Sequence, residues 1–193
     1  MMSELTVLLG RLEEQWRRNG LPCSDRVRPG LPTAQIEQAL SAWEMEPSEE
    51  VVDWFAWHDG GVGEAWVAAG WRLLSLEEAF EHYDTHVTAE LFEEENGGWF
   101  PLAQNPGGVA LVADCRGPRS ARSEVGTVGK VPELAPAEFR VDSLTTLVGW
   151  WVEQFESGVW TGGGGSYDSI VVHRTPEQSK ALSRRMTHEG YVR

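Results

Sequence analysis

Hydrophobic residues recur every three or four positions in several stretches of the chain, a spacing typical of amphipathic helices. The first predicted helix runs from Ser3 to Arg18 and ends at Asn19-Gly20. Two others begin at Ser75 and at Asp142 or Ser143, residues that favour the N-cap position. Their inner faces are, in chain order, Leu5, Leu8, Leu9, Leu12 and Trp16; Leu76, Ala79, Phe80, Tyr83, Val87 and Leu91; and Leu144, Leu147, Val148, Trp151, Val152, Phe155 and Val159.

Two shorter helices are predicted between residues 33 and 59, after a loop at 21–32 that holds three prolines and a glycine. Thr33 can cap the first of them, and Pro47 starts the second in its first turn, with Glu49 and Glu50 near the positive end of the helix dipole. The residues expected to be buried are Ile36, Ala39, Leu40 and Trp43 in the first and Val51, Val52, Trp54 and Phe55 in the second. Asp59-Gly60-Gly61 ends the second helix.

The spacing changes to that of strands in the middle of the chain. Residues 65–74 predict one short, bent or bulged strand, and three further strands are expected at 99–103, 109–115 and 124–131. Residues 160–168 predict a glycine-rich break, followed by a short strand at 169–173 and a last helix that starts at Thr175. Runs of helices and runs of strands indicate a single α+β domain, with a central mixed or antiparallel sheet flanked by N-terminal helices and a C-terminal helix.

The charge of the chain narrows the class of partner. The 193 residues carry a formal net charge of −14, which argues against binding to nucleic acid or to an anionic membrane and favours a cationic protein partner. No apolar run approaches the length of a membrane span, and Cys23 and Cys115 form neither a metal knuckle nor a disulfide framework. We therefore expect a cytoplasmic protein; its oligomeric state is left open by the sequence.

Candidate catalytic and metal-binding residues are few. His58-Asp59 can be an acid-base pair, but adjacent residues at a helix end seldom face each other, so we favour a structural role in the helix terminus and loop. His82 and His86 lie four residues apart and can ligate zinc, although their acidic helix favours surface pairing. We expect no cofactor, and a metal-dependent hydrolase using these histidines stands as the least favoured alternative.

Ten tryptophans are an unusual number for this length. Those within helical stretches are expected mostly in the core, namely Trp43, Trp54, Trp150 and Trp151. Others lie near glycines and element ends, namely Trp57, Trp66, Trp71, Trp99 and Trp160, and some of them are expected at the surface. An exposed tryptophan among carboxylates is typical of an interface hot spot for a cationic partner.

An ordered set of short motifs resembles the SUKH superfamily, the family of Smi/Knr cell-wall regulators. The motifs, spread over residues 33 to 160, are Ile36-Glu37 followed by Pro47, a helix closing in Trp57-His58-Asp59-Gly60-Gly61, Ser75-Leu76-Glu77-Glu78, Trp99-Phe100-Pro101-Leu102, the strand Val109 to Asp114, and the helix Ser143 to Val152. The resemblance implies an α+β fold without catalysis. Bacterial relatives are mostly immunity proteins that neutralise toxins, and fungal relatives are interaction proteins.

The resemblance divides the chain into an N-terminal helix and Pro-rich loop (1–30), a SUKH-like domain (31–160) and a glycine-rich link with a C-terminal extension (161–193). It predicts a bacterial immunity protein that occludes a basic toxin, possessing no enzymatic activity. A regulatory scaffold with an internal partner is the alternative. We expect the contact surface to include Asp59, Glu64, Trp66, Trp99 and Asp114.

Overall fold

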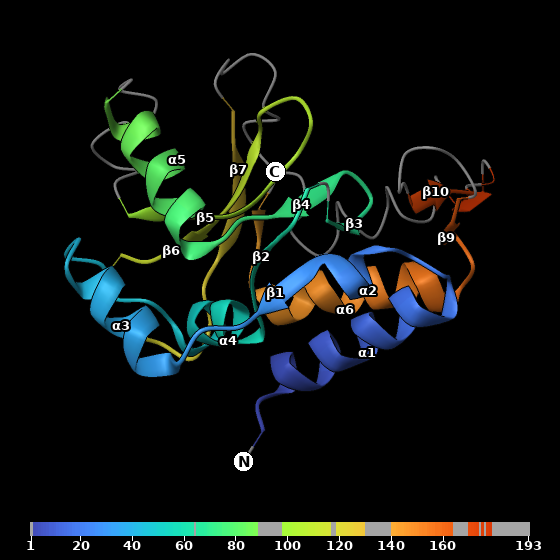
Figure 1. The fold of residues 1–193 in the computed structure, drawn as a ribbon, viewed down its shortest axis with the longest axis horizontal. Coiled ribbons are helices and arrows are strands. Elements are labelled where there is room, and N and C mark those ends of the chain that lie inside the picture. The colour runs from blue at the N-terminus through green and yellow to red at the C-terminus, as the bar shows by residue number, and fades with distance from the viewer. Residues whose placement is uncertain are drawn as a thin grey trace.

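The computed structural model describes residues 2–63, 65–88, 98–116, 119–129, 140–163, 170–173, 175 and 177–178, with the backbone alone for 86–88. These residues form an α+β fold in which helices α1, α4 and α6 lie below a curled antiparallel sheet (Figure 1). The helices are α1 (Glu4–Arg18), α2 (Cys23–Arg26), α3 (Thr33–Ser41), α4 (Glu49–Trp57), α5 (Leu76–Thr88) and α6 (Leu144–Glu156). The predicted fold class is confirmed.

The main sheet has six strands in the order β3-β4-β5-β6-β7-β8, and each neighbouring pair is antiparallel. Its strands are β3 (Trp66–Ala68), β4 (Trp71–Leu73), β5 (Trp99–Gln104), β6 (Ala110–Asp114), β7 (Val125–Val128) and β8 (Arg140–Val141). Two small antiparallel pairs lie beside it: β1 (Val27–Pro29) with β2 (His58–Gly61), and β9 (Trp160–Gly162) with β10 (Ile170–Val172). Neighbouring strands along the chain are therefore mostly neighbours in space.

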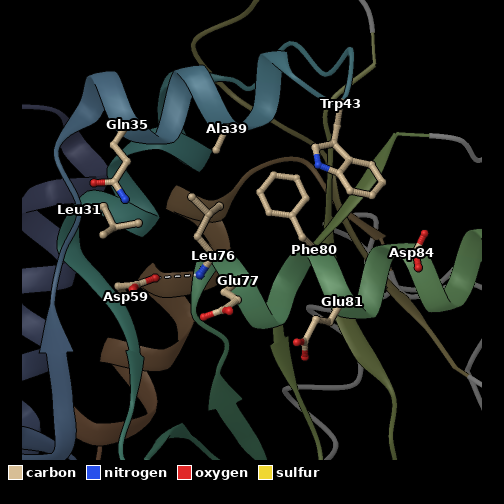
Figure 2. A pocket seen from close by; sticks show the side chains of 10 residues that line it. All are labelled: Leu31, Gln35, Ala39, Trp43, Asp59, Leu76, Glu77, Phe80, Glu81 and Asp84. Carbon is tan, nitrogen blue, oxygen red and sulfur yellow. Dashed lines mark hydrogen bonds between the residues drawn. The ribbon is translucent and has the colours of Figure 1, made fainter.

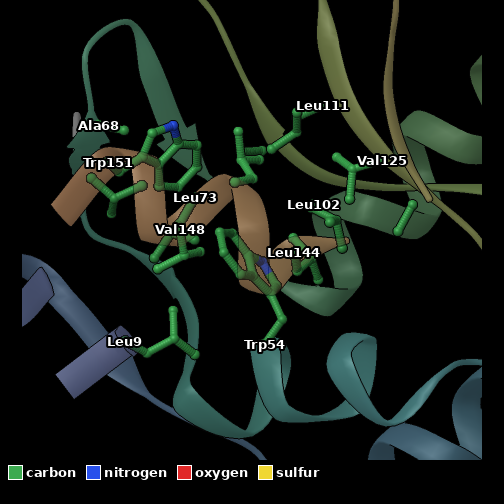
Figure 3. Close-up of a cluster of buried hydrophobic side chains, with 14 of the residues drawn as sticks. Leu9, Trp54, Ala68, Leu73, Leu102, Leu111, Val125, Leu144, Val148 and Trp151 are labelled. Atoms are coloured by element: carbon green, nitrogen blue, oxygen red, sulfur yellow. The ribbon is translucent and has the colours of Figure 1, made fainter. Parts of the chain in front are cut away.

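The hydrophobic core lies between one face of the sheet and the helices α1, α4 and α6 (Figure 3). Each helix presents the apolar stripe that its sequence predicts, and α1 packs against both α4 and α6. The Trp16 indole N–H donates to the Val67 carbonyl at 3.0 Å, so α1 also joins the sheet through a buried hydrogen bond. The first and last described parts of the chain share this core, since it includes Leu5, Leu9, Leu12, Trp160 and Ile170.

Glu50 organises the junction of α4, α6 and β7 from within the core. The carboxylate is 4% exposed and accepts hydrogen bonds from the backbone N–H groups of Ser123 (3.2 Å), Leu144 (3.0 Å) and Thr145 (3.1 Å), and from the Thr145 hydroxyl (2.5 Å). A buried carboxylate is tolerated because its oxygens are satisfied and because it lies at the positive end of α6. The sequence predicts Glu50 in the first turn of its own helix, α4, which the structure confirms, and its hydrogen bonds add a second role at the start of α6.

Several predicted boundaries are wrong in detail, each because tertiary pairing overrides a local signal. The Pro-rich loop contains the short helix α2 and the strand β1. Strand β1 pairs with residues 58–61, so the predicted end of the second short helix is also a strand, β2. The single strand at 65–74 is a hairpin, β3-β4, whose turn holds Gly70 at φ +84°. Part of the glycine-rich break is strand β9, and the strand at 169–173 is confirmed over 170–172.

Helix starts are also corrected. Thr33 is the first helical residue after the cap Pro32, and α4 is capped by Ser48, whose hydroxyl accepts from the Val51 N–H, rather than opened by Pro47. The Ser75–Glu78 capping box is confirmed: the Ser75 N–H donates to Glu78 at 2.8 Å and the Glu78 N–H donates to Ser75 at 3.1 Å. The last predicted helix lies outside the described residues beyond 178. At its predicted start, the Thr175 N–H donates to the Gln178 side chain at 2.9 Å and the Gln178 N–H donates to the Thr175 hydroxyl at 3.2 Å.

Candidate functional site

A groove of about 720 Å³ lies between α3 and α5 (Figure 2). Its apolar lining is Leu31, Ala39, Trp43, Leu76 and Phe80, and its polar lining is Gln35, Asp59, Glu77, Glu81 and Asp84. An apolar floor with a few polar groups is the usual composition of a binding site. All four charged lining residues are carboxylates, so the groove is negatively charged, as the chain is overall.

The walls of the groove are fixed by hydrogen bonds at the start of α5. The Leu76 N–H, in the first turn of α5, donates to the Asp59 carboxylate at 2.7 Å, which ties the helix to strand β2 (Figure 2). Gly60, the next residue, has φ +69°, and a Cβ there would lie 2.6 Å from the Ser75 backbone nitrogen. The His-Asp-Gly-Gly stretch therefore positions α5 and, with it, one wall of the groove.

Trp43 is the exposed aromatic residue of the groove. Its ring stacks on Phe80, with centroids 5.3 Å apart and planes 25° apart, and meets Tyr83 edge-on at 5.9 Å. Phe80 in turn contacts the core ring of Phe100 at 5.0 Å. Trp43 nevertheless remains 44% exposed, so the prediction that it belongs to the core is wrong: α3 ends at Ser41, and Trp43 lies beyond its last turn.

The turn after α3 holds Trp43 at a defined angle. The Met45 N–H donates to the Leu40 carbonyl at 3.2 Å and the Glu44 N–H donates to the Ser41 carbonyl at 3.1 Å, which is the bond pattern of a Schellman motif. Glu44 occupies the left-handed position of this motif, at φ +58°, where glycine is usual. Buried Met45 follows and anchors the turn in the core.

Of the residues predicted to contact a partner, Asp59 lines the groove, and its carboxylate also caps α5. Glu64 lies outside the described residues. Trp66 is half-buried in the edge strand β3. Trp66, Trp99 and Asp114 do not line the groove. Sequence reasoning missed Trp43 and the acidic stripe of α5 as site residues, although the acidic composition of that helix was the available signal.

Trp99 and Asp114 are brought together by the pairing of β5 with β6, in which they are direct partners. The Trp99 ring is 2% exposed and lies under two guanidinium groups, Arg140 at 4.1 Å and Arg116 at 5.2 Å from its centroid. Partial burial raises the pKa of Asp114, but hydrogen bonds from the Arg116 side chain and backbone outweigh it and hold that pKa below its usual range. Trp99 therefore offers no open face to a partner in this fold.

The histidines do not assemble a reactive centre in the described part of the chain. His58 Nδ1 donates to the Arg28 carbonyl at 2.8 Å, and Nε2 lies 3.2 Å from the Glu13 carboxylate, which also accepts from the Trp57 indole at 2.6 Å. This is the structural role predicted for His58. The side chain of His86 lies outside the described residues, and no group of three metal-ligating residues is found among those that are described.

Neither cysteine is placed to react. Cys23 and Cys115 are both buried and free, and burial raises the pKa of each thiol to about 12. Among the described residues, no helix combines the length and the apolar character that a membrane span requires.

Comparison of the sequence with known proteins finds no matching family model and no matching curated protein. The resemblance to the SUKH superfamily thus stays a prediction.

Proposed function

We propose that this chain is a non-enzymatic protein-binding domain that engages a cationic protein through the α3–α5 groove. The observation that carries the proposal is a tryptophan left 44% exposed at the edge of an apolar groove whose charged lining is entirely acidic. Exposed tryptophan in a partly apolar recess is typical of the few residues that dominate binding energy. The net charge of −14 steers a basic partner toward the chain and repels acidic ones.

The narrower form of the proposal is an immunity protein that neutralises a basic toxin by occluding its surface. It is supported by the ordered SUKH-like motifs and by the structural use of His58 and Asp59, the residues that otherwise offer an acid-base pair. Occlusion needs only complementary shape and charge, and the groove offers an apolar floor with an acidic rim. The partner would be a toxin domain with a basic substrate-binding surface, for example a nuclease.

The test is co-expression with the product of a toxin-like gene adjacent to this one. We expect growth to be rescued and the two proteins to purify as a stoichiometric complex. Rescue should be lost in the triple variant Trp43→Ala, Glu81→Gln, Asp84→Asn and kept in the control Glu14→Gln, Glu156→Gln, whose carboxylates lie on α1 and α6. Absence of a toxin-like neighbour, together with stable binding to a non-toxic chromosomal protein, favours the regulatory scaffold instead.

A further inference from the structure

We propose that the groove receives an arginine side chain of the partner, with its guanidinium against the Trp43 ring and paired with the carboxylates of α5. This inference rests on the proposed function, which makes the occupant a protein. It specifies the residue type that the groove reads. The argument has three parts: an aromatic face, a row of carboxylates, and an equivalent arrangement completed elsewhere in the same chain.

The aromatic face is provided by Trp43. Phe80 stacks on the ring with planes 25° apart, and the Tyr83 ring meets it at 88°. These neighbours hold the indole in place but leave it 44% exposed. Tryptophan is the strongest aromatic partner for a cation, and a guanidinium adds planar stacking to the electrostatic attraction.

The carboxylates form one stripe along α5. Glu77, Glu81 and Asp84 are spaced four and three residues apart, so they lie on the same face of the helix over about 10 Å. All three are exposed, and none of them forms an ion pair with a described residue. A row of like charges beside an apolar floor is complementary to cationic side chains carried on an apolar segment.

The surroundings of Trp99, on strand β5, show what completes such an arrangement. Trp99 lies under Arg140 and Arg116, and these guanidiniums pair with Glu124 at 3.6 Å and Asp114 at 2.8 Å. There the chain supplies tryptophan, carboxylates and arginines together. The groove has the tryptophan and the carboxylates, but none of its ten lining residues is an arginine, lysine or histidine. The missing cation is what a partner would bring.

The probe is a peptide of alternating leucine and arginine with capped ends, compared with the same peptide carrying citrulline, lysine or glutamate in place of arginine. Citrulline keeps the planar shape of arginine and removes its charge. Binding to the full chain is followed by the Trp43 indole N–H resonance, assigned by its disappearance in Trp43→Phe. We expect the arginine peptide to shift this resonance and to bind about tenfold more tightly than the citrulline peptide and threefold more tightly than the lysine peptide.

Variants separate the groove from the general acidity of the chain. Trp43→Ala should raise the Kd of the arginine peptide by about tenfold or more. Glu81→Gln with Asp84→Asn should raise it by about fivefold. The control Glu14→Gln with Glu156→Gln removes the same charge from α1 and α6 and should change the Kd by less than twofold. Added salt should weaken the binding of the arginine and lysine peptides and leave the binding of the citrulline peptide unchanged.

Two results overturn the inference: equal binding of the arginine and citrulline peptides, or binding that leaves the Trp43 resonance unmoved. Both are independent of the toxin experiment. A chain that neutralises a toxin but ignores arginine retains the proposed function without this inference, whereas a chain that binds the arginine peptide at Trp43 and no toxin retains the inference alone.

Discussion

Trp43 and Trp99 lie in two regions that both combine a tryptophan with carboxylates, but among the described residues only the region of Trp99 also contains arginines. Both rings have carboxylates in their surroundings, and Tyr83 on α5 packs against Trp43 and against the buried cluster that holds Trp99. Trp99 is 2% exposed and lies under Arg116 and Arg140, while Trp43 is 44% exposed beside a groove whose charged lining residues are all carboxylates. The comparison indicates that Trp99 serves the fold and Trp43 serves a partner, which measurements of stability and binding can separate.

The largest expected effect comes from truncating the two rings. Trp99→Ala removes a buried indole and should lower the free energy of unfolding by about 3–5 kcal/mol, as is usual for large-to-alanine changes in a core. Trp43→Ala should cost about 1 kcal/mol, chiefly the lost ring stacking on Phe80, while abolishing most binding. Urea denaturation of both variants gives the comparison. Equal losses of stability would contradict the division of roles.

The next effect tests the frame of the groove. Gly60→Ala combines a left-handed backbone with a Cβ placed 2.6 Å from the Ser75 nitrogen, so it should lower stability by about 2–4 kcal/mol and loosen the start of α5. Gly63→Ala is the matched control, because Gly63 has a similar φ of +67° and open space around it. That variant should cost about 1 kcal/mol. Unfolding curves and amide protection in α5 check the difference.

These two regions also show where sequence reasoning succeeds. The apolar stripes of α1, α4 and α6, the capping box and the strands β5, β6 and β7 depend on local periodicity and caps, and they are confirmed. A structural role for His58-Asp59 is predicted from its position at a helix end, but the partners that fill this role, Glu13, Arg28 and Leu76, lie 17 to 45 residues away. Local patterns are sufficient for features whose partners lie within a few residues.

What sequence reasoning could not find depends on contacts between distant segments. Glu50 looks like a first-turn acid of α4, but its partners are 73 to 95 residues away. Trp43 continues the spacing of α3, yet a turn with Glu44 in a left-handed conformation carries it to the surface. Trp99 stands near glycines like an exposed residue, and only the arrival of β8 brings Arg140 over it. Long-range pairing decides all three.

A stabilising substitution is expected at Glu44. A non-glycine residue at φ +58° carries a conformational cost, so Glu44→Gly should raise the free energy of unfolding by about 1 kcal/mol. Glu44→Gln keeps the strain and removes the charge, and it should leave stability within a few tenths of a kcal/mol. A glycine variant no more stable than the glutamine variant would remove this argument.

The smallest expected effect concerns the ion pair beside Trp99. Arg116 holds the pKa of Asp114 below its usual range, so the carboxylate contributes stability that is present above the unfolded pKa of about 3.9 and is lost as pH falls through the folded pKa. Because the pair is partly exposed and screened, Asp114→Asn should cost about 0.5–1 kcal/mol at pH 7. As pH falls below the unfolded pKa of about 3.9, the stabilities of the two proteins should converge, as followed by urea denaturation. Arg116→Gln should show the same convergence, since it removes the cation that lowers the pKa, whereas a stability difference constant from pH 7 to 3 would mean that the arginines cover Trp99 by packing alone.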